Sequence, residues 1–242
     1  MKNIQITGWC SRFIEEQVQE GDLCIDATAG NGSDTLLLSR LCGNTGHVLA
    51  FDIQRDALDH TKEKLLKESP FQNCKCILDS HSNMEAYASP DTVSCIVFNF
   101  GYLPGGDHTI STRIKTSMPA LSSSLKLLKK GGLLSLCIYS GGDTGFEEHD
   151  AVLSWLKSLD PHCYLVIKSE FYNRPNHPST GACAGDPAKI NGSIPEDQSR
   201  TLMYSITGCW SAGMVPLSSV GLASLQMAST TSIPEVTSPN AA

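Results

Sequence analysis

Short apolar runs alternate along this chain with longer segments in which apolar residues recur every three or four positions. The runs have the length of buried strands, and the helical spacing, as in Leu36–Leu38 followed by Leu41, is typical of amphipathic helices. Strands that alternate with helices form a parallel sheet covered on both faces, so the pattern predicts a doubly wound α/β fold. Strands are predicted near 23–27, 47–52, 74–78, 93–99, 132–139 and 163–170, and helices near 10–19, 34–42, 55–67, 82–88, 116–129 and 146–159.

The run Lys129-Lys130-Gly131-Gly132 is expected to end one of these helices. Cations are favourable at the negative end of a helix, and glycine is the common residue just beyond it. The next strand is therefore predicted to begin at Gly132.

A glycine-containing turn, Asp26 to Thr35, joins the first predicted strand to the helix that follows it. Gly30 and Gly32 allow the backbone to approach a ligand closely, and the helix N-terminus offers unpaired N–H groups to an anion. We therefore predict a binding site for a nucleotide-type cofactor here.

The residues around the turn favour S-adenosylmethionine over a dinucleotide. The third glycine of the dinucleotide fingerprint is replaced by Thr35, and Asp34 would repel a pyrophosphate. Acidic residues suit the cationic methionine part of S-adenosylmethionine. Asp52 ends the second predicted strand, 22 residues beyond Gly30, where a carboxylate can accept hydrogen bonds from both ribose hydroxyls.

The composition of this 242-residue chain favours an intracellular enzyme with one main domain. No run of 18 apolar residues occurs, so no membrane association is predicted. Six of the ten cysteines fall in predicted strands and are expected to be reduced core residues. Cys74 and Cys76 are expected to point to opposite faces of a strand and lack a second pair, so no metal site is predicted. Localisation is expected to be cytoplasmic, with an organelle left open.

A second polar and aromatic motif, Asn99 to Asp107, follows the fourth predicted strand. It should lie at the same edge of the sheet as the glycine turn, because the carboxyl ends of parallel strands share one edge. The spacing from Asn99 to Tyr102 matches the Asn-Pro-Pro-Tyr pattern of amino-group methyltransferases. In that pattern the amide carbonyl accepts a hydrogen bond from the target nitrogen and the ring stacks on the base.

From Gly21 to Pro178 the chain resembles the small class I methyltransferases that act on the aminomethyl group of wobble uridine in tRNA, a family long labelled putative rRNA methylases. The resemblance is carried by the motifs at 26–35, 51–54, 80–81, 99–107, 138–139 and 173–178. It implies a Rossmann-like fold and methyl transfer from S-adenosylmethionine to an exocyclic amine of tRNA, and it leaves room for a homodimer.

The resemblance also implies roles for individual residues. Asn31 and Asp34 would hold the methionine part of the cofactor, Asp52 and Gln54 the ribose and the adenine edge, and Ser80 and His81 the far side of the adenosine. Apart from this resemblance, the Asn-Pro-Pro-Tyr spacing predicts that Asn99 orients the acceptor amine and that Tyr102 stacks on the base. Asp107 and His81 are the candidates to take the proton of the amine. The predicted cofactor site comprises Asp26, Gly30, Asn31, Gly32, Asp34, Thr35, Asp52, Gln54, Ser80 and His81, and the predicted catalytic residues are Asn99, Tyr102 and Asp107.

The segment Ser179–Ala242 differs in composition from the rest of the chain. Only 6 of its 64 residues are charged and 17 are serine or threonine, so we expect a mostly irregular tail after a methyltransferase domain of residues 1–178. The family closes its sheet with one more strand, and without it the strand near 163–170 would be an unprotected edge. Leu202–Ile206 is the alternative source of that strand.

The net charge of −7 argues against indiscriminate binding to RNA. Insertion of one anticodon base into an aromatic pocket needs less positive charge, and Arg113 and Lys115 are the candidates for a local basic patch. Two alternatives stay open, because fold and cofactor loop do not specify an acceptor: a small-molecule methyltransferase and a noncatalytic methyltransferase-like protein.

Overall fold

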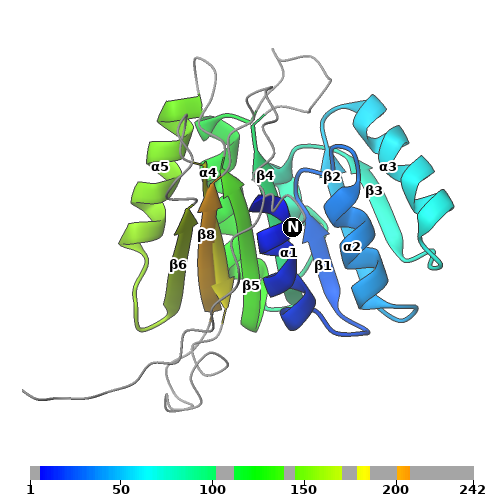
Figure 1. Cartoon of the computed structure of the whole chain (residues 1–242), viewed down its shortest axis with the longest axis horizontal. Helices are drawn as coiled ribbons and strands as arrows, with labels where there is room; N and C mark the ends of the chain where they lie inside the picture. The colour runs from blue at the N-terminus through cyan, green and yellow to red at the C-terminus, as the bar shows by residue number, and fades with distance from the viewer. Residues whose placement is uncertain (1–5, 102–111, 139–144, 171–178, 186–200, 208–242) are drawn as a thin grey trace, which may run out of the picture. The chain divides into compact units, whose positions relative to one another are not determined.

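The computed structural model describes residues 6–101, 112–138, 145–170, 179–185 and 201–207, which all belong to one compact unit within Ile4–Ser211. Five strands form a parallel sheet in the order β3-β2-β1-β4-β5 (Figure 1). They are β1 (Leu23–Asp26), β2 (His47–Asp52), β3 (Cys74–Leu78), β4 (Val93–Phe100) and β5 (Leu128–Ile138). The Rossmann-like, doubly wound fold expected from the sequence is confirmed.

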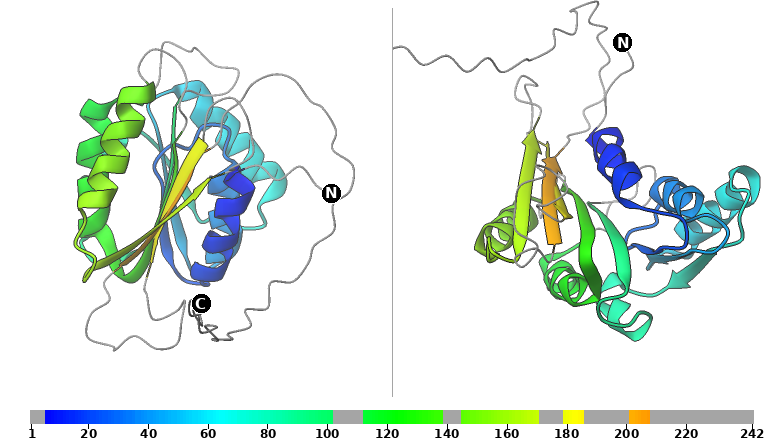
Figure 2. Two further views of the ribbon diagram at one scale, coloured as in Figure 1. Left: turned by 60° about the vertical axis from the view of Figure 1, so that its left-hand side comes forward. Right: turned by 90° about the horizontal axis from the view of Figure 1, so that it is seen from below.

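Helices cover both faces of this sheet (Figure 2). One face carries α1 (Ile6–Gln17), α2 (Ser33–Cys42) and α3 (Arg55–Glu68). The other carries the short 3-10 helix η1 (His81–Ala86), α4 (Ile114–Leu127) and α5 (Gly145–Ser158). Strands buried on both faces are mostly apolar, which is why β4 reads Val-Ser-Cys-Ile-Val-Phe without regular alternation.

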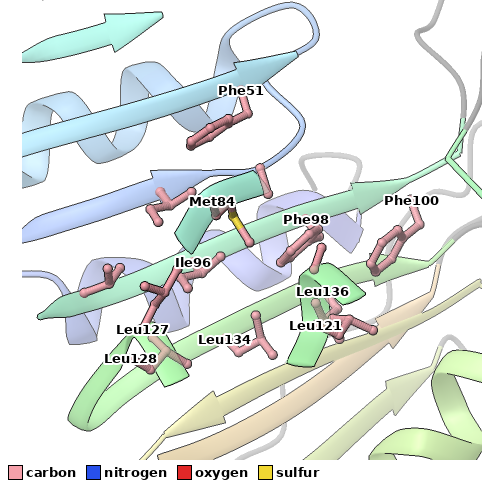
Figure 3. Packing of buried hydrophobic residues seen from close by; sticks show 14 of the residues in the cluster. Phe51, Met84, Ile96, Phe98, Phe100, Leu121, Leu127, Leu128, Leu134 and Leu136 are labelled. Carbon is pink, nitrogen blue, oxygen red and sulfur yellow. The ribbon is translucent and has the colours of Figure 1, made fainter. Parts of the chain in front are cut away.

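The larger core lies between the sheet and the second layer of helices (Figure 3). Phe98 and Phe100 of β4 stack with their ring centroids 5.2 Å apart. Met84 of η1 and Leu121 of α4 pack into the same cluster and are fully buried. The end of β4 is therefore held by aromatic packing directly beside Asn99.

The junction of α4 and β5 differs from the prediction. The helix ends at Leu127 and β5 begins at Leu128, so the run Lys129–Gly132 lies within the strand instead of ending the helix. The register between β4 and β5 shifts there, and Gly131 has a φ of +73°. Glycine is suited to such a bulge, and Lys129 Nζ donates to Asp22 Oδ1 at 2.6 Å. Smaller differences are that α1 spans 6–17 and that 81–86 is a 3-10 helix.

The sheet continues beyond residue 178, which corrects the expectation of irregular chain for two segments. After β6 (Tyr164–Glu170), Ser179–Gly185 forms β7 and Thr201–Thr207 forms β8. Strand β7 pairs antiparallel with β5 and β6, and β8 pairs parallel with β6 and has further pairings with β5 and β7. The alternative that Leu202–Ile206 supplies a strand agrees with β8, and β6 is not an unpaired edge. Residues 186–200 and 208–242 lie outside the described residues.

Truncation should reveal how much these two strands stabilise the fold. A chain that ends after Pro178 loses the backbone hydrogen bonds that β7 and β8 make with β5 and β6. At a net 0.5–1.5 kcal/mol for a typical hydrogen bond, we expect its free energy of unfolding to fall by several kcal/mol relative to a chain that ends after Thr207. Urea denaturation of the two truncated chains measures the difference, and equal midpoints would contradict it.

Eight cysteines whose side chains the structure describes form no disulfide: Cys10, Cys24, Cys42, Cys74, Cys76, Cys95, Cys137 and Cys163. Cys163 lies one residue before β6 and not within it. The expectation that Cys74 and Cys76 point to opposite faces is wrong. Residues two apart on a strand share a face, and these two side chains are hydrogen-bonded to each other beside α3.

Among the described residues, no helix is long and apolar enough to cross a membrane.

Candidate cofactor and methyl-transfer site

The predicted site residues gather where β1, β2, β3 and β4 end, which we call the carboxyl edge of the sheet. Asp26 ends β1, Asp52 ends β2, and Asn99 is the next-to-last residue of β4. The parallel register places Asp26 beside Val97 and Asp52 beside Leu78, so the strand ends are level. Ser80 and His81 follow β3 at the start of η1.

The glycine turn is held by Asp52 and by α3. Gly30 N donates to Asp52 Oδ2 at 2.9 Å, and Thr61 of α3 donates from Oγ1 to Gly30 O at 3.1 Å. Gly30 and Gly32 have positive φ values of 51° and 73°. A Cβ atom on Gly32 would lie 2.9 Å from the Thr61 Cα, so both the conformation and the close approach require glycine.

Asp26 is fully buried beneath the turn. It accepts hydrogen bonds from Thr35 Oγ1 at 2.6 Å and from Thr28 N at 3.1 Å. Burial, together with the nearby Asp34 carboxylate, raises the pKa of Asp26 to about 7. Thr35, which replaces the third glycine of the dinucleotide fingerprint, is itself fully buried and holds Asp26 through its hydroxyl group.

Asp34 and Asn99 connect the first helix after the turn to β4. Asn99 Nδ2 donates to Asp34 Oδ2 at 2.7 Å, and Asn99 N donates to Thr28 Oγ1 at 2.7 Å. Burial raises the pKa of Asp34, and the hydrogen bond from Asn99 opposes that rise. The Asn99 Oδ1 atom is buried and has no hydrogen-bond partner among the described residues.

His81 is the other group with an unpartnered atom at this edge. Its ring is buried, lies 5.8 Å from the Phe98 ring in an edge-on contact, and hydrogen-bonds to the backbone of Ala27. Burial lowers the pKa of His81. Its Nε2 is buried and has no partner among the described residues. Two orphaned polar atoms beside a glycine turn fit a bound ligand, because buried polar groups are otherwise paired.

The remaining predicted residues are more exposed or belong to local structure. Asn31 is exposed and Gln54, which donates from its backbone N to Asp52 Oδ1 at 2.9 Å, is partly buried. Ser80 Oγ accepts from Ser82 N at 3.2 Å and thereby caps η1. Tyr102 and Asp107 lie outside the described residues.

Sequence reasoning missed three residues of this network. Thr28 is part of the 26–35 motif, but its side-chain contact with Asn99 was not anticipated. Thr112 and Glu148 were not singled out at all. Thr112 bonds to Gly101, 11 positions earlier, and to Glu148, 36 positions later, and no local pattern marks either contact.

Asp26 should lower the stability of the folded protein at neutral pH. An unfolded aspartate loses its proton near pH 3.9, whereas folded Asp26 does so near pH 7, so stability falls as pH rises from about 4 to about 7. Asp26→Asn, whose oxygen can accept from Thr28 N and whose amide nitrogen can donate to Thr35 Oγ1, is expected to gain up to about 4 kcal/mol at pH 8 and to flatten that dependence. Urea denaturation at pH 5 and pH 8 measures this, with exposed Glu16→Gln as the control. A variant no more stable than the original chain at pH 8 would contradict the assigned burial cost.

The fold and the groups at the carboxyl edge are those of a Rossmann-like, S-adenosylmethionine-dependent methyltransferase domain. The family described as "Putative rRNA methylase" matches residues 48–184, and the chain belongs to this family.

Three relatives illustrate the similarity. A putative rRNA methylase from Clostridium thermocellum is 42% identical, with a TM-score of 0.70 over 76% of this chain and 98% of that one. A putative methyltransferase from Streptococcus mutans in complex with SAH is 32% identical, with a TM-score of 0.66 over 75% and 97% of the two chains. The chloroplastic tRNA (mnm(5)s(2)U34)-methyltransferase of Arabidopsis thaliana is 37% identical over 175 residues, which are 68% of this chain and 63% of that protein. This chain therefore spans less than two thirds of that relative.

Proposed function

We propose that this protein transfers a methyl group from S-adenosylmethionine to the nitrogen of the 5-aminomethyl group on the wobble uridine of tRNA. The name of the Arabidopsis relative, a tRNA (mnm(5)s(2)U34)-methyltransferase, supports this choice of acceptor. The observation in the structure that carries the proposal is the buried, unpartnered Oδ1 of Asn99.

Asn99 has the orientation that an acceptor-amine site needs. Its Nδ2 donates to Asp34 Oδ2, so the amide is held by one end and its carbonyl oxygen is left as an acceptor. An amine N–H can donate to that oxygen. This hydrogen bond fixes the orientation of the amine and therefore the direction in which its nitrogen lone pair points. Fixed orientation of the nucleophile is one of the larger contributions an enzyme makes to a displacement reaction.

The cofactor supplies an electrophilic methyl group at its sulfonium when it is bound. Asp34 and Asn31 would hold its methionine part, with Asp26, Gly30, Gly32 and Thr35 shaping the turn beneath it. Asp52 and Gln54 would bind the ribose and the adenine edge, and Ser80 and His81 the far side of the adenosine. The neutral His81 ring, whose pKa burial lowers, can accept a hydrogen bond at Nε2.

The acceptor amine has to lose a proton before it can react. An alkyl amine has a pKa around 10, so the free base costs about 4 kcal/mol at neutral pH. A dry site lowers that cost because burial disfavours the ammonium form. Asp107 is the proposed proton acceptor and His81 the alternative, and Tyr102 is proposed to stack on the base.

Binding of tRNA would rely on the inserted base more than on its backbone. The net charge of −7 disfavours broad phosphate contact. Arg113 and Lys115, both exposed at the start of α4, are the described cations proposed for a local phosphate contact. We also propose that the protein forms a homodimer. It is proposed to act in the cytoplasm or in an organelle, and the Arabidopsis relative is named as chloroplastic.

The test uses labelled S-adenosylmethionine and two tRNAs that differ only in the aminomethyl group at the wobble uridine. We expect label to enter the aminomethyl tRNA and not the unmodified one. Label in neither tRNA, with cofactor binding intact, would contradict this acceptor and favour a small molecule. Failure to bind the cofactor would favour the noncatalytic alternative.

A further inference from the structure

A buried carboxylate outside the site is linked through Thr112 to the residue that follows the strand carrying Asn99. Glu148 lies in the first turn of α5, and its side chain is only 5% exposed. Burial raises the pKa of Glu148. A buried acid costs free energy unless it is hydrogen-bonded, so its presence here needs a reason.

Two hydroxyl groups satisfy the Glu148 carboxylate. Ser117 Oγ, from α4, donates to Oε1 at 2.5 Å, and Thr112 Oγ1 donates to Oε2 at 2.7 Å. Both bonds lower the pKa of Glu148 and so favour its ionised form, against the effect of burial. Within the described part of the chain, the carboxylate is thus held by hydroxyl donors instead of a cation.

Thr112 connects this carboxylate to the end of β4. Its Oγ1 accepts from Gly101 N at 2.8 Å, and its backbone N donates to Gly101 O at 2.9 Å. Gly101 is two residues beyond Asn99 and has a φ of +139°. Because Thr112 Oγ1 gives its only proton to Glu148, its lone pairs are directed at the Gly101 N–H.

We propose that Glu148 is a positioning residue for methyl transfer: through Thr112 it fixes Gly101, and thereby the end of β4 from which Asn99 addresses the acceptor amine. This rests on the proposed role of Asn99. Glu148 acts on the geometry of the acceptor side, while the glycine turn keeps the hydrogen bonds that it makes with Asp52 and Thr61.

Ser117 provides a matched control, since it bonds to the same carboxylate but not to Gly101. We expect Thr112→Val and Glu148→Gln in the full chain to lower kcat by about 10- to 100-fold, because a displaced reacting group is costly. The dissociation constant for S-adenosylmethionine should stay within about twofold. Thr112→Ser, which keeps the hydroxyl, should restore kcat to within about threefold, and Ser117→Ala should lower stability without lowering kcat.

The outcomes separate the positioning role from a structural one. If Thr112→Val keeps its kcat, or if Ser117→Ala lowers kcat as much as Thr112→Val does, the inference is wrong. If Glu148→Gln fails to fold, the comparison of Thr112→Val with Thr112→Ser still decides. If Asn99→Ala itself keeps its kcat, the proposed role of Asn99 is wrong. That result would contradict the proposed function and not only the role of Glu148.

Discussion

Replacement of Asn99 by alanine is expected to lower the rate of methyl transfer by at least about 10²-fold at saturating cofactor, because the carbonyl that orients the acceptor amine is removed. The same change removes the hydrogen bond that opposes the raised pKa of Asp34. The pKa of Asp34 should then rise further, so any loss of cofactor binding at pH 7 should lessen at pH 9.

Single-turnover rates and calorimetry at both pH values separate these two effects. The rate should stay low at pH 9, since alkaline pH cannot replace the carbonyl oxygen. Asn44→Ala is the matched control, because Asn44 is exposed between α2 and β2 at the opposite edge of the sheet. If the dissociation constant for the cofactor rises as much as the rate falls, and remains raised at pH 9, Asn99 belongs to the cofactor site and not to the acceptor site.

Asp52→Ala should weaken the binding of S-adenosylmethionine by about 1.5–3 kcal/mol, or roughly 10- to 150-fold, through loss of charge-assisted hydrogen bonds to the ribose. Part of that loss has another source, since Asp52 Oδ2 also accepts the Gly30 N–H that holds the turn. Thr61→Val removes the other side-chain bond to Gly30 and keeps the carboxylate, so it measures the contribution of the turn alone.

A ligand lacking one ribose hydroxyl isolates the direct contact. The 2′-deoxy analogue of S-adenosylhomocysteine should bind the original chain and the Thr61→Val variant more weakly than S-adenosylhomocysteine does. In Asp52→Ala the two ligands should bind alike, because the carboxylate that distinguishes them is gone. An unchanged preference in Asp52→Ala would refute the contact between Asp52 and the ribose.

Much of the architecture was predictable from local patterns. Strands β1 to β4 and helices α2 and α3 were predicted within one residue or two, because buried parallel strands and amphipathic helices leave different periods in the sequence. The α4–β5 junction was not. Glycine after lysine is favourable at a helix end, but Leu128 is buried and paired with Val93, so the strand begins before Lys129.

The sequence by itself determined the order of strands and helices and the acidic glycine turn, since these depend on residues close together in the chain. It also indicated that Asp26, Asp52 and Asn99 share one edge, because parallel strands end on the same side. Tertiary structure alone decided which of these groups touch. The contact of Asn99 with Asp34 spans 65 positions and that of Thr112 with Glu148 spans 36, and such bonds depend on packing between elements, which leaves no period in the sequence.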